Sequence, residues 1–267
     1  MRSHSQAYFS GGEHLAGLGD AFVMSPIVHK ISKDYDKVYF PARHANYETV
    51  KCLFQDNSRV EVFSYVFPYV IHEDIENIKK WLADKDCVRI NPPDITITKL
   101  HIPGIDIPVP VAINWDRQLY EYYDMTISSR YSEFKLPKYI DGSSELFDQL
   151  TNGDTNYCLL HQQTSLHSHG MIELHLHNWR LQYNLPPMKI IEITPEITKN
   201  MLQYVKLIEN AKEIHCVPSS FFCLVDSIYE RTSANLFLHD IRADTLMQIN
   251  SKWNNNRWNI VKYDRKL

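Results

Sequence analysis

The segment from Gly11 to Asp20 reads GGEHLAGLGD and lies between a short apolar run, Ala7 to Ser10, and an amphipathic run, Ala21 to Ser32. Its four glycines permit a tight turn in which the backbone approaches a ligand closely. A strand, a glycine-rich turn and a helix in this order are typical of α/β units with parallel strands. The segment therefore predicts an α/β fold with this turn at the carboxyl edge of a sheet.

Asp20 is the first candidate for chemistry in this turn. The start of a helix carries unpaired backbone N–H groups, and open α/β sheets bind ligands at the carboxyl ends of their strands. Asp20 is predicted to lie beside both. The alternative is that its carboxylate only caps the helix, which contributes about 0.5–2 kcal/mol and needs no substrate. The turn alone leaves both interpretations open.

The glycine spacing argues against two common nucleotide motifs. Gly12, Gly17 and Gly19 cannot be read as GxGxxG, and no acidic residue clearly ends the second predicted strand, so NAD binding is disfavoured. No Gly-Lys-Ser or Gly-Lys-Thr occurs, which excludes a Walker A loop.

The alternation continues along the chain and then restarts. In the first half it predicts further elements at Lys37–Phe40, Tyr47–Phe54, Val60–Tyr65, His72–Leu82 and Cys87–Ile90. In the second half it predicts them at Ser144–Leu150, Tyr157–His161, Met188–Ile193, Glu213–Val217, Ser219–Tyr229 and Ala234–Leu238. Thr194-Pro195 is also predicted to start a helix that carries Ile197 on its apolar face.

A break between the two halves is predicted near residue 140, where Pro137 and Gly142 interrupt regular structure. The 267 residues suit two linked lobes of about 100–150 residues each. We therefore place one lobe at residues 1–140 and a second at 141–267, with residues 252–267 packing back on the first lobe.

The second candidate site is the segment Ile214 to Phe222, IHCVPSSFF, where a strand gives way to a helix opened by Ser219 and Ser220. Free N–H groups, two hydroxyls and the positive end of the helix dipole together suit a diphosphate without a metal. The alternative is ordinary helix capping by Ser219.

Bulk properties exclude several classes of protein. A net charge of −4 argues against broad binding to nucleic acid or anionic membranes. No stretch approaches the ~20 apolar residues of a membrane span, and the polar start is unlike a signal peptide, so we expect a cytoplasmic protein without a transmembrane segment. Five cysteines without a CxxC pair indicate buried thiols rather than disulfides or a zinc site.

The two turns together resemble GT-B glycosyltransferases, especially heptosyltransferase-like and related bacterial or viral polysaccharide enzymes. The resemblance rests on Gly17 to Asp20 followed by Ser25-Pro26, and on the late strand, turn and helix from Glu213 to Ser227. It implies two Rossmann-like lobes with a cleft between them, an acceptor-binding lobe first and a nucleotide-sugar-binding lobe second.

The resemblance also implies roles for the residues of both turns. Asp20 falls where the family has its general base, while Glu13 and His14 orient the acceptor or replace Asp20 as base. Gly17 and Gly19 lie on the acceptor side. The expected donor-binding residues are Ser219, Ser220, Phe221, His161, Arg130, Lys135, Arg180 and Glu192.

The histidine-rich region around Glu173, His175 and His177 is a weak candidate for a metal site, because three or four converging ligands are needed. We expect no metal and no cofactor.

The resemblance thus implies a metal-independent, inverting hexosyl- or pentosyltransferase. It would move a sugar from a nucleoside-diphosphate sugar, UDP- or GDP-linked, to a hydroxyl of a glycan acceptor. Two rivals remain: a nucleotide-sugar epimerase or phosphate-binding hydrolase, which predicts one continuous sheet, and a non-catalytic nucleotide- or sugar-binding protein.

Overall fold

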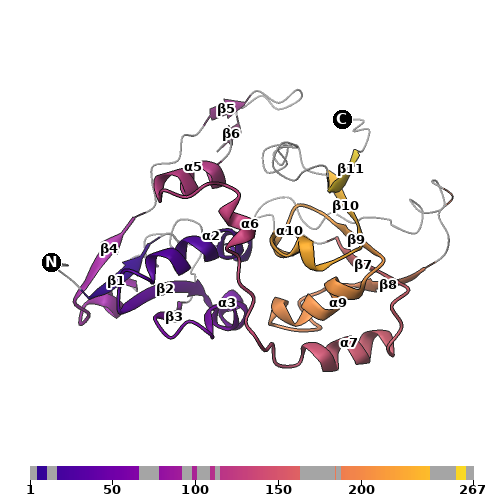
Figure 1. Cartoon of the computed structure of the whole chain (residues 1–267), viewed down its shortest axis with the longest axis horizontal. Coiled ribbons are helices and arrows are strands. Elements are labelled where there is room, and N and C mark those ends of the chain that lie inside the picture. The colour runs from indigo at the N-terminus through magenta and orange to yellow at the C-terminus, as the bar shows by residue number, and fades with distance from the viewer. Residues whose placement is uncertain are drawn as a thin grey trace. The chain divides into compact units, whose positions relative to one another are not determined.

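The computed structural model describes residues 5–10, 17–65, 78–91, 98–100, 109–111, 115–162, 184, 188–240 and 257–262. The chain divides into two compact units (Figure 1). The first comprises residues Met1–Thr96 and Trp115–Ile140, and the second comprises Ile97–Asn114 and Asp141–Leu267.

The first unit is built on a parallel sheet. Its described strands are β1 (Gln6–Phe9), β2 (Lys37–Arg43), β3 (Val60–Tyr65) and β4 (Cys87–Ile90), in the order β3-β2-β1-β4. All three pairings are parallel. The chain moves outward from β1 to β3 and then returns to add β4 on the other side of β1. The carboxyl ends of β1 and β4 therefore form a topological switch point, where open α/β sheets bind ligands.

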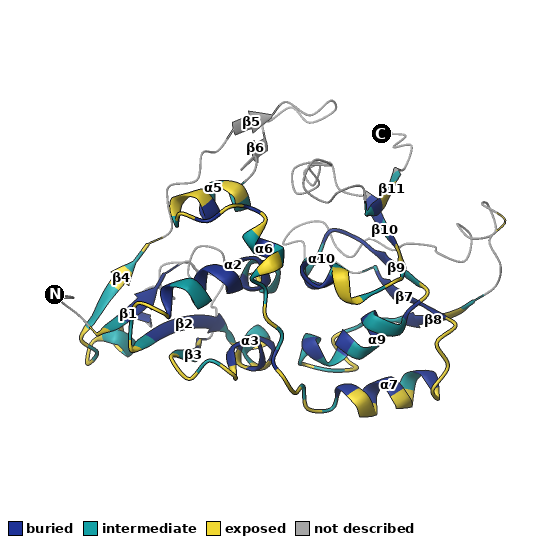
Figure 2. Ribbon diagram, in the orientation of Figure 1, coloured by how far each residue is buried: buried dark blue, intermediate teal, exposed yellow. Residues whose placement is uncertain are grey.

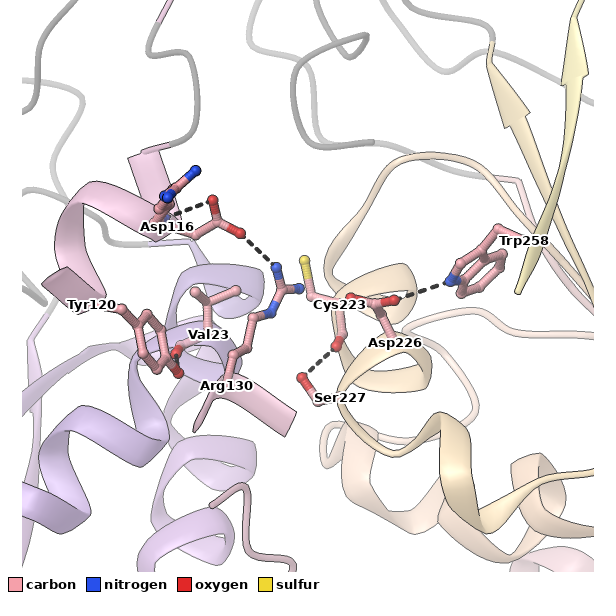
Figure 3. Close-up of polar contacts among 9 residues, drawn as sticks. Val23, Asp116, Tyr120, Arg130, Cys223, Asp226, Ser227 and Trp258 are labelled. Carbon is pink, nitrogen blue, oxygen red and sulfur yellow. Dashed lines mark hydrogen bonds and ion pairs between the residues drawn. The ribbon is translucent and has the colours of Figure 1, made fainter. Parts of the chain in front are cut away.

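The three longest helices of the first unit bury apolar side chains. The described helices of this unit are α2 (Leu18–Ile31), η1 (His44–Asn46), α3 (Tyr47–Phe54), α5 (Trp115–Tyr122) and α6 (Ser129–Ser132), and residues 78–82 are also helical. Phe9 and Phe40 stack with ring centroids 6.0 Å apart, and Phe54 packs on Phe40 at 5.4 Å. The buried Tyr120 hydroxyl donates to the Val23 carbonyl at 2.7 Å and so ties α5 to α2 (Figure 3).

The second unit contains a larger parallel sheet. Its described strands are β7 (Tyr157–His161), β8 (Lys189–Glu192), β9 (Glu213–Cys216), β10 (Asn235–Asp240) and β11 (Trp258–Lys262), in the order β11-β10-β9-β7-β8. All four pairings are parallel. The chain moves from β7 to β8 and then crosses to place β9 on the other side of β7. A second switch point therefore lies at the carboxyl ends of β7 and β9.

Helices of the second unit are α7 (Ser143–Thr151), η2 (Met201–Tyr204), α9 (Val205–Asn210), α10 (Ser220–Ser227) and η3 (Tyr229–Arg231). α7 presents one buried and one exposed side (Figure 2). The Tyr157 hydroxyl donates to the Leu207 carbonyl at 2.7 Å and links β7 to α9. Two further short strands, β5 (Thr98–Leu100) and β6 (Val109–Val111), pair antiparallel.

The predicted α/β class with two Rossmann-like sheets is confirmed. The described parallel strands form two separate sheets. The epimerase or hydrolase alternative predicts one continuous sheet, and that prediction is wrong. The alternating pattern of the sequence is typical of strands buried between helices, and Tyr157–His161 is a strand over the predicted range.

The helix predicted to begin at Thr194-Pro195 is wrong in its start. A 3-10 turn begins at Met201 and leads into α9, and the Asn200 side chain caps it by accepting the Leu202 N–H at 3.1 Å. The Asn200 side chain thus supplies the cap that Thr194 was expected to supply. Ile197 consequently lies before the helix and is 38% exposed.

The final segment contains the edge strand of the second sheet. Within residues 252–267, which were expected to pack on the first lobe, Trp258–Lys262 form β11 beside β10. The buried Trp258 indole N–H donates to a carboxylate oxygen of Asp226 in α10 at 3.0 Å (Figure 3). This bond ties the edge strand to the helix that carries the second candidate site.

Replacing Trp258 by Phe should lower the free energy of unfolding by about 1–3 kcal/mol, because the buried Asp226 carboxylate loses a donor while most of the aromatic packing stays. Urea unfolding measures the change. Tyr122→Phe is the control, since its ring is 57% exposed and surface changes stay within about 0.5 kcal/mol. Equal effects of the two changes would contradict a stabilising role for the Trp258–Asp226 bond.

Candidate functional site

The switch point of the first unit is held together by polar groups. The Ser10 hydroxyl lies 3.0 Å from the Ile90 carbonyl and 2.9 Å from the Asn91 side-chain oxygen, and Arg89 donates to the same oxygen at 2.7 Å. Tyr123 donates to the Asn91 carbonyl at 2.9 Å. These bonds fix the carboxyl ends of β1 and β4 side by side. Ser10 and Asn91 were not among the predicted site residues, although each comes directly after a strand.

Asp20 lies in the first turn of α2, the helix that follows β1. One of its carboxylate oxygens accepts the Gly17 N–H at 3.0 Å, so Asp20 does cap the helix. A Cβ atom on residue 17 would lie 2.7 Å from that oxygen. Glycine at position 17 therefore leaves the space in which the Asp20 carboxylate sits.

The electrostatics of Asp20 go beyond capping. Burial raises the pKa of its carboxyl from 3.8 to about 6, although the Gly17 N–H and the Arg43 guanidinium both act to lower it. The cost of removing the charge from water thus outweighs the two favourable contacts. A carboxylate with a pKa near neutrality can accept a proton from a substrate and release it again.

For the other predicted acceptor-side residues, the structure gives only the burial of the two glycines. Gly19 is half-buried within α2, and Gly17 is exposed at its start. Glu13 and His14 lie outside the described residues.

The second switch point brings together two of the predicted donor-binding residues. His161 ends β7, and its carbonyl accepts the Val217 N–H at 3.0 Å where β9 ends. Ser219 caps α10 by accepting the Phe222 N–H at 3.3 Å, and its hydroxyl lies 3.2 Å from Nδ1 of His161. The crossover of the chain has therefore placed His161 beside the start of α10, although 58 positions separate His161 from Ser219.

His161 is neutral at pH 7. Burial lowers the pKa of its imidazole from 6.5 to about 4. The ring stacks on the fully buried Phe221 with centroids 5.3 Å apart and an interplanar angle of 21°. Phe221 thus holds the plane of the His161 ring by stacking on one of its faces. When Ser219 donates its hydroxyl hydrogen to Nδ1, Nε2 of His161 carries the ring hydrogen and is a donor.

Glu192 adds a carboxylate to the same edge of the sheet. It ends β8 and is the register partner of Leu160 in β7. The Gln162 amide donates to its carboxylate at 2.7 Å, so a residue directly after β7 orients the acidic group. A carboxylate at the end of the second strand is where Rossmann-type sheets hydrogen-bond a ribose.

The remaining predicted donor contacts fall in other settings. Ser220 is half-buried in the first turn of α10. Arg130, in the first unit, is 6% exposed and its guanidinium pairs with the Asp116 carboxylate at 2.8 Å (Figure 3). Lys135 is exposed, also in the first unit. Arg180 lies outside the described residues.

The fold is similar to that of known proteins of solved structure. No protein-family model and no curated protein matches the chain. Among solved structures, the crystal structure of the glycosyl transferase family 9 protein from Veillonella parvula DSM 2008 matches 100% of this chain and 90% of its own, at 8% identity and a TM-score of 0.53. The fold is similar to that of this glycosyl transferase. The GT-B fold that the sequence resemblance implies is thus confirmed.

A second solved structure is also similar in outline. It is the E. coli heptosyltransferase WaaC with ADP-2-deoxy-2-fluoro heptose, which matches over 96% of this chain and 92% of its own at 9% identity, with a TM-score of 0.46. Among the described helices of the present chain, none has the length and apolar character needed to cross a bilayer.

Replacing Asp20 by Asn should stabilise the protein at pH 8 by about 1–3 kcal/mol. The folded carboxyl, with a pKa of about 6 against 3.8, binds more protons than the unfolded one, so wild-type stability falls as the pH rises through this window. Asparagine is neutral and its amide oxygen can still accept the Gly17 N–H. The advantage of the variant should therefore be small at pH 4 and full above pH 6.

Urea unfolding at pH 4 and pH 8 measures this difference. Asp148→Asn is the control, because it removes an exposed charge from α7. If Asp20 only capped the helix, loss of its charge at the positive end of the dipole would destabilise the protein at pH 8. That result would contradict the argument from burial.

Proposed function

We propose that this protein is a glycosyltransferase that moves a sugar from a nucleoside-diphosphate sugar to a hydroxyl of a glycan acceptor. The observation that carries the proposal is the arrangement of His161, Ser219 and the start of α10 at the switch point of a sheet whose fold matches a glycosyl transferase. Glu192 and Asp20 are assigned further roles in the same reaction.

The donor diphosphate is assigned to the start of α10. This helix has eight residues, and its first-turn N–H groups and dipole favour an anion. Ser220 is half-buried there, and with Ser219 donating to Nδ1 of His161, Nε2 of that neutral ring is a further donor. Neutral donors bind a diphosphate without a divalent cation, which supports a metal-independent reaction.

The nucleoside is assigned to the neighbouring edge of the same sheet. Glu192 is held there by Gln162, and a carboxylate accepts hydrogen bonds from both hydroxyls of a ribose. We extend the proposal to UDP- or GDP-linked donors, and to a hexose or pentose as the sugar that is transferred.

Asp20 is assigned as the general base from the sequence resemblance, and its raised pKa supports this role. The acceptor oxygen attacks the anomeric carbon, the bond between that carbon and the diphosphate oxygen breaks, and the acceptor proton passes to the Asp20 carboxylate. The electron pair leaves with the diphosphate, whose negative charge the N–H groups of α10 stabilise. Attack opposite to the leaving group inverts the anomeric configuration. We further propose that the reaction takes place in the cytoplasm.

UDP or GDP should raise the melting temperature, because a ligand that binds the native state stabilises it. Screening UDP, GDP, ADP and CMP derivatives measures this. Ser219→Ala and Glu192→Gln should each weaken nucleotide binding about tenfold or more, since each changes a polar group of the assigned site. Ser144→Ala, an exposed serine of α7, is the control. Failure of every nucleotide to shift the melting temperature would count against the proposal.

Turnover should rise with pH through about 6, because only the ionised Asp20 can accept the acceptor proton. Asp20→Asn should lower turnover about 10²–10⁴-fold while leaving the nucleotide dissociation constant unchanged. Transfer of radiolabelled sugar over pH 5–8 measures the first effect and calorimetric titration the second. A variant that keeps full turnover would move the role of base to Glu13 or His14, and unchanged biological output without any turnover would favour the non-catalytic rival.

A further inference from the structure

The second sheet carries a cluster of polar side chains on a face that the proposed transfer reaction does not use. Side chains alternate along a strand, so Cys158 and His161 of β7 point to opposite faces. His161 stacks on Phe221 of α10. The face that carries Cys158 is therefore the one away from α10.

Strand register gathers three potential metal ligands on this face. Cys158 in β7 is the parallel partner of Glu213 in β9, and His215 lies two residues further along β9 on the same side. One ligand atom from each of the three side chains lies within 4.8 Å of the other two. A tetrahedral zinc site needs such atoms about 3.3–3.7 Å apart, given bond lengths of about 2.0–2.3 Å.

The three side chains lie in a largely buried setting. Cys158 and His215 are fully buried, and the Glu213 side chain is 12% exposed. Glu213 Oε2 lies 3.3 Å from Nε2 of His215. The carboxylate and the imidazole are thus already neighbours, and both are ligand types that bind zinc. A divalent cation bound by one thiolate, one carboxylate and one neutral imidazole would make the site electrically neutral.

His239 of β10 contacts His215 through the ring nitrogen that does not face Glu213. Its Nε2 lies 2.8 Å from Nδ1 of His215, on the side of that ring away from Glu213. Metal-binding histidines commonly donate their second ring N–H to such a partner, which fixes the ring and the tautomer. Phe237 stacks on His215 with centroids 4.4 Å apart and holds the ring plane. The ring of His215 is thus oriented with Nε2 toward Glu213.

We propose that Cys158, Glu213 and His215 bind one thiophilic divalent cation, Zn²⁺ by the chemistry of the donor set, with His239 as a positioning residue. A thiolate and an imidazole together select zinc over magnesium or calcium. On binding, the Cys158 thiol loses its proton to the buffer, a bond forms between its sulfur and the metal, and no electron is transferred. The ion joins β7 to β9 and does not take part in the transfer reaction.

Cobalt tests the site directly, because tetrahedral Co²⁺ bound to a thiolate absorbs strongly in the visible and near-ultraviolet. The full chain is treated with a chelator and a phosphine reductant, then titrated with Co²⁺. We expect saturation at one equivalent with a thiolate-to-cobalt band, and loss of the band when Zn²⁺ is added. A spectrum that matches free Co²⁺ throughout the titration would overturn the proposal.

Variants identify the ligands. Cys158→Ser should remove the charge-transfer band, and Glu213→Gln, which is close to isosteric, should weaken Co²⁺ binding at least tenfold. The matched control is Cys216→Ser, because Cys216 is equally buried but points to the other face of β9. A band that survives Cys158→Ser would overturn the assignment. Circular dichroism checks the fold, and the wild-type titration stands even if a variant does not fold.

The role of His239 is separable from a merely structural one. His239→Leu should weaken Zn²⁺ binding about 10–100-fold, measured by competition with a chromophoric chelator. His239→Gln should restore most of the affinity, since its amide oxygen can accept the Nδ1 hydrogen of His215. Equal affinity in both variants and the wild type would show that His239 does not position the ligand.

Discussion

The parallel pairing of β7 with β9 is the constraint on which the second unit depends. Parallel strands cannot be joined by a tight turn, so the chain leaves the sheet after β7, returns as β8 on one side and again as β9 on the other. The connections must then diverge at the carboxyl ends of β7 and β9. His161 and Ser219 meet for this reason, and the opposite face of the same two strands aligns Cys158 with Glu213.

Asp20 caps a helix and is also the residue that we propose as general base. Its carboxylate satisfies a backbone N–H of Gly17 and is nevertheless held where ionisation is costly. A helix start needs only a hydrogen-bond acceptor. An acceptor that stays in water would cap the helix without the cost of burying a charge. The excess cost at this position is what supports a functional interpretation, because strained or destabilised groups concentrate at functional sites.

The sequence predicts the fold class and most elements because buried strands and amphipathic helices leave periodic patterns. It places Tyr157–His161 as a strand and Glu192 at a strand end. Thr194-Pro195 misleads because a favourable helix start is local, whereas Asn200 supplies the cap that the structure uses. The register that aligns Cys158 with Glu213 arises only from long-range pairing, so no spacing in the sequence reveals that cluster.

Gly17 has a consequence for how this turn is inherited. The space that a side chain at position 17 would fill is occupied by the Asp20 carboxylate. The two positions are therefore coupled: a side chain at position 17 forces the Asp20 carboxylate to shift, and a chain without that carboxylate has no such conflict at position 17. Among descendants of this sequence, Gly17 and Asp20 should be kept together or lost together.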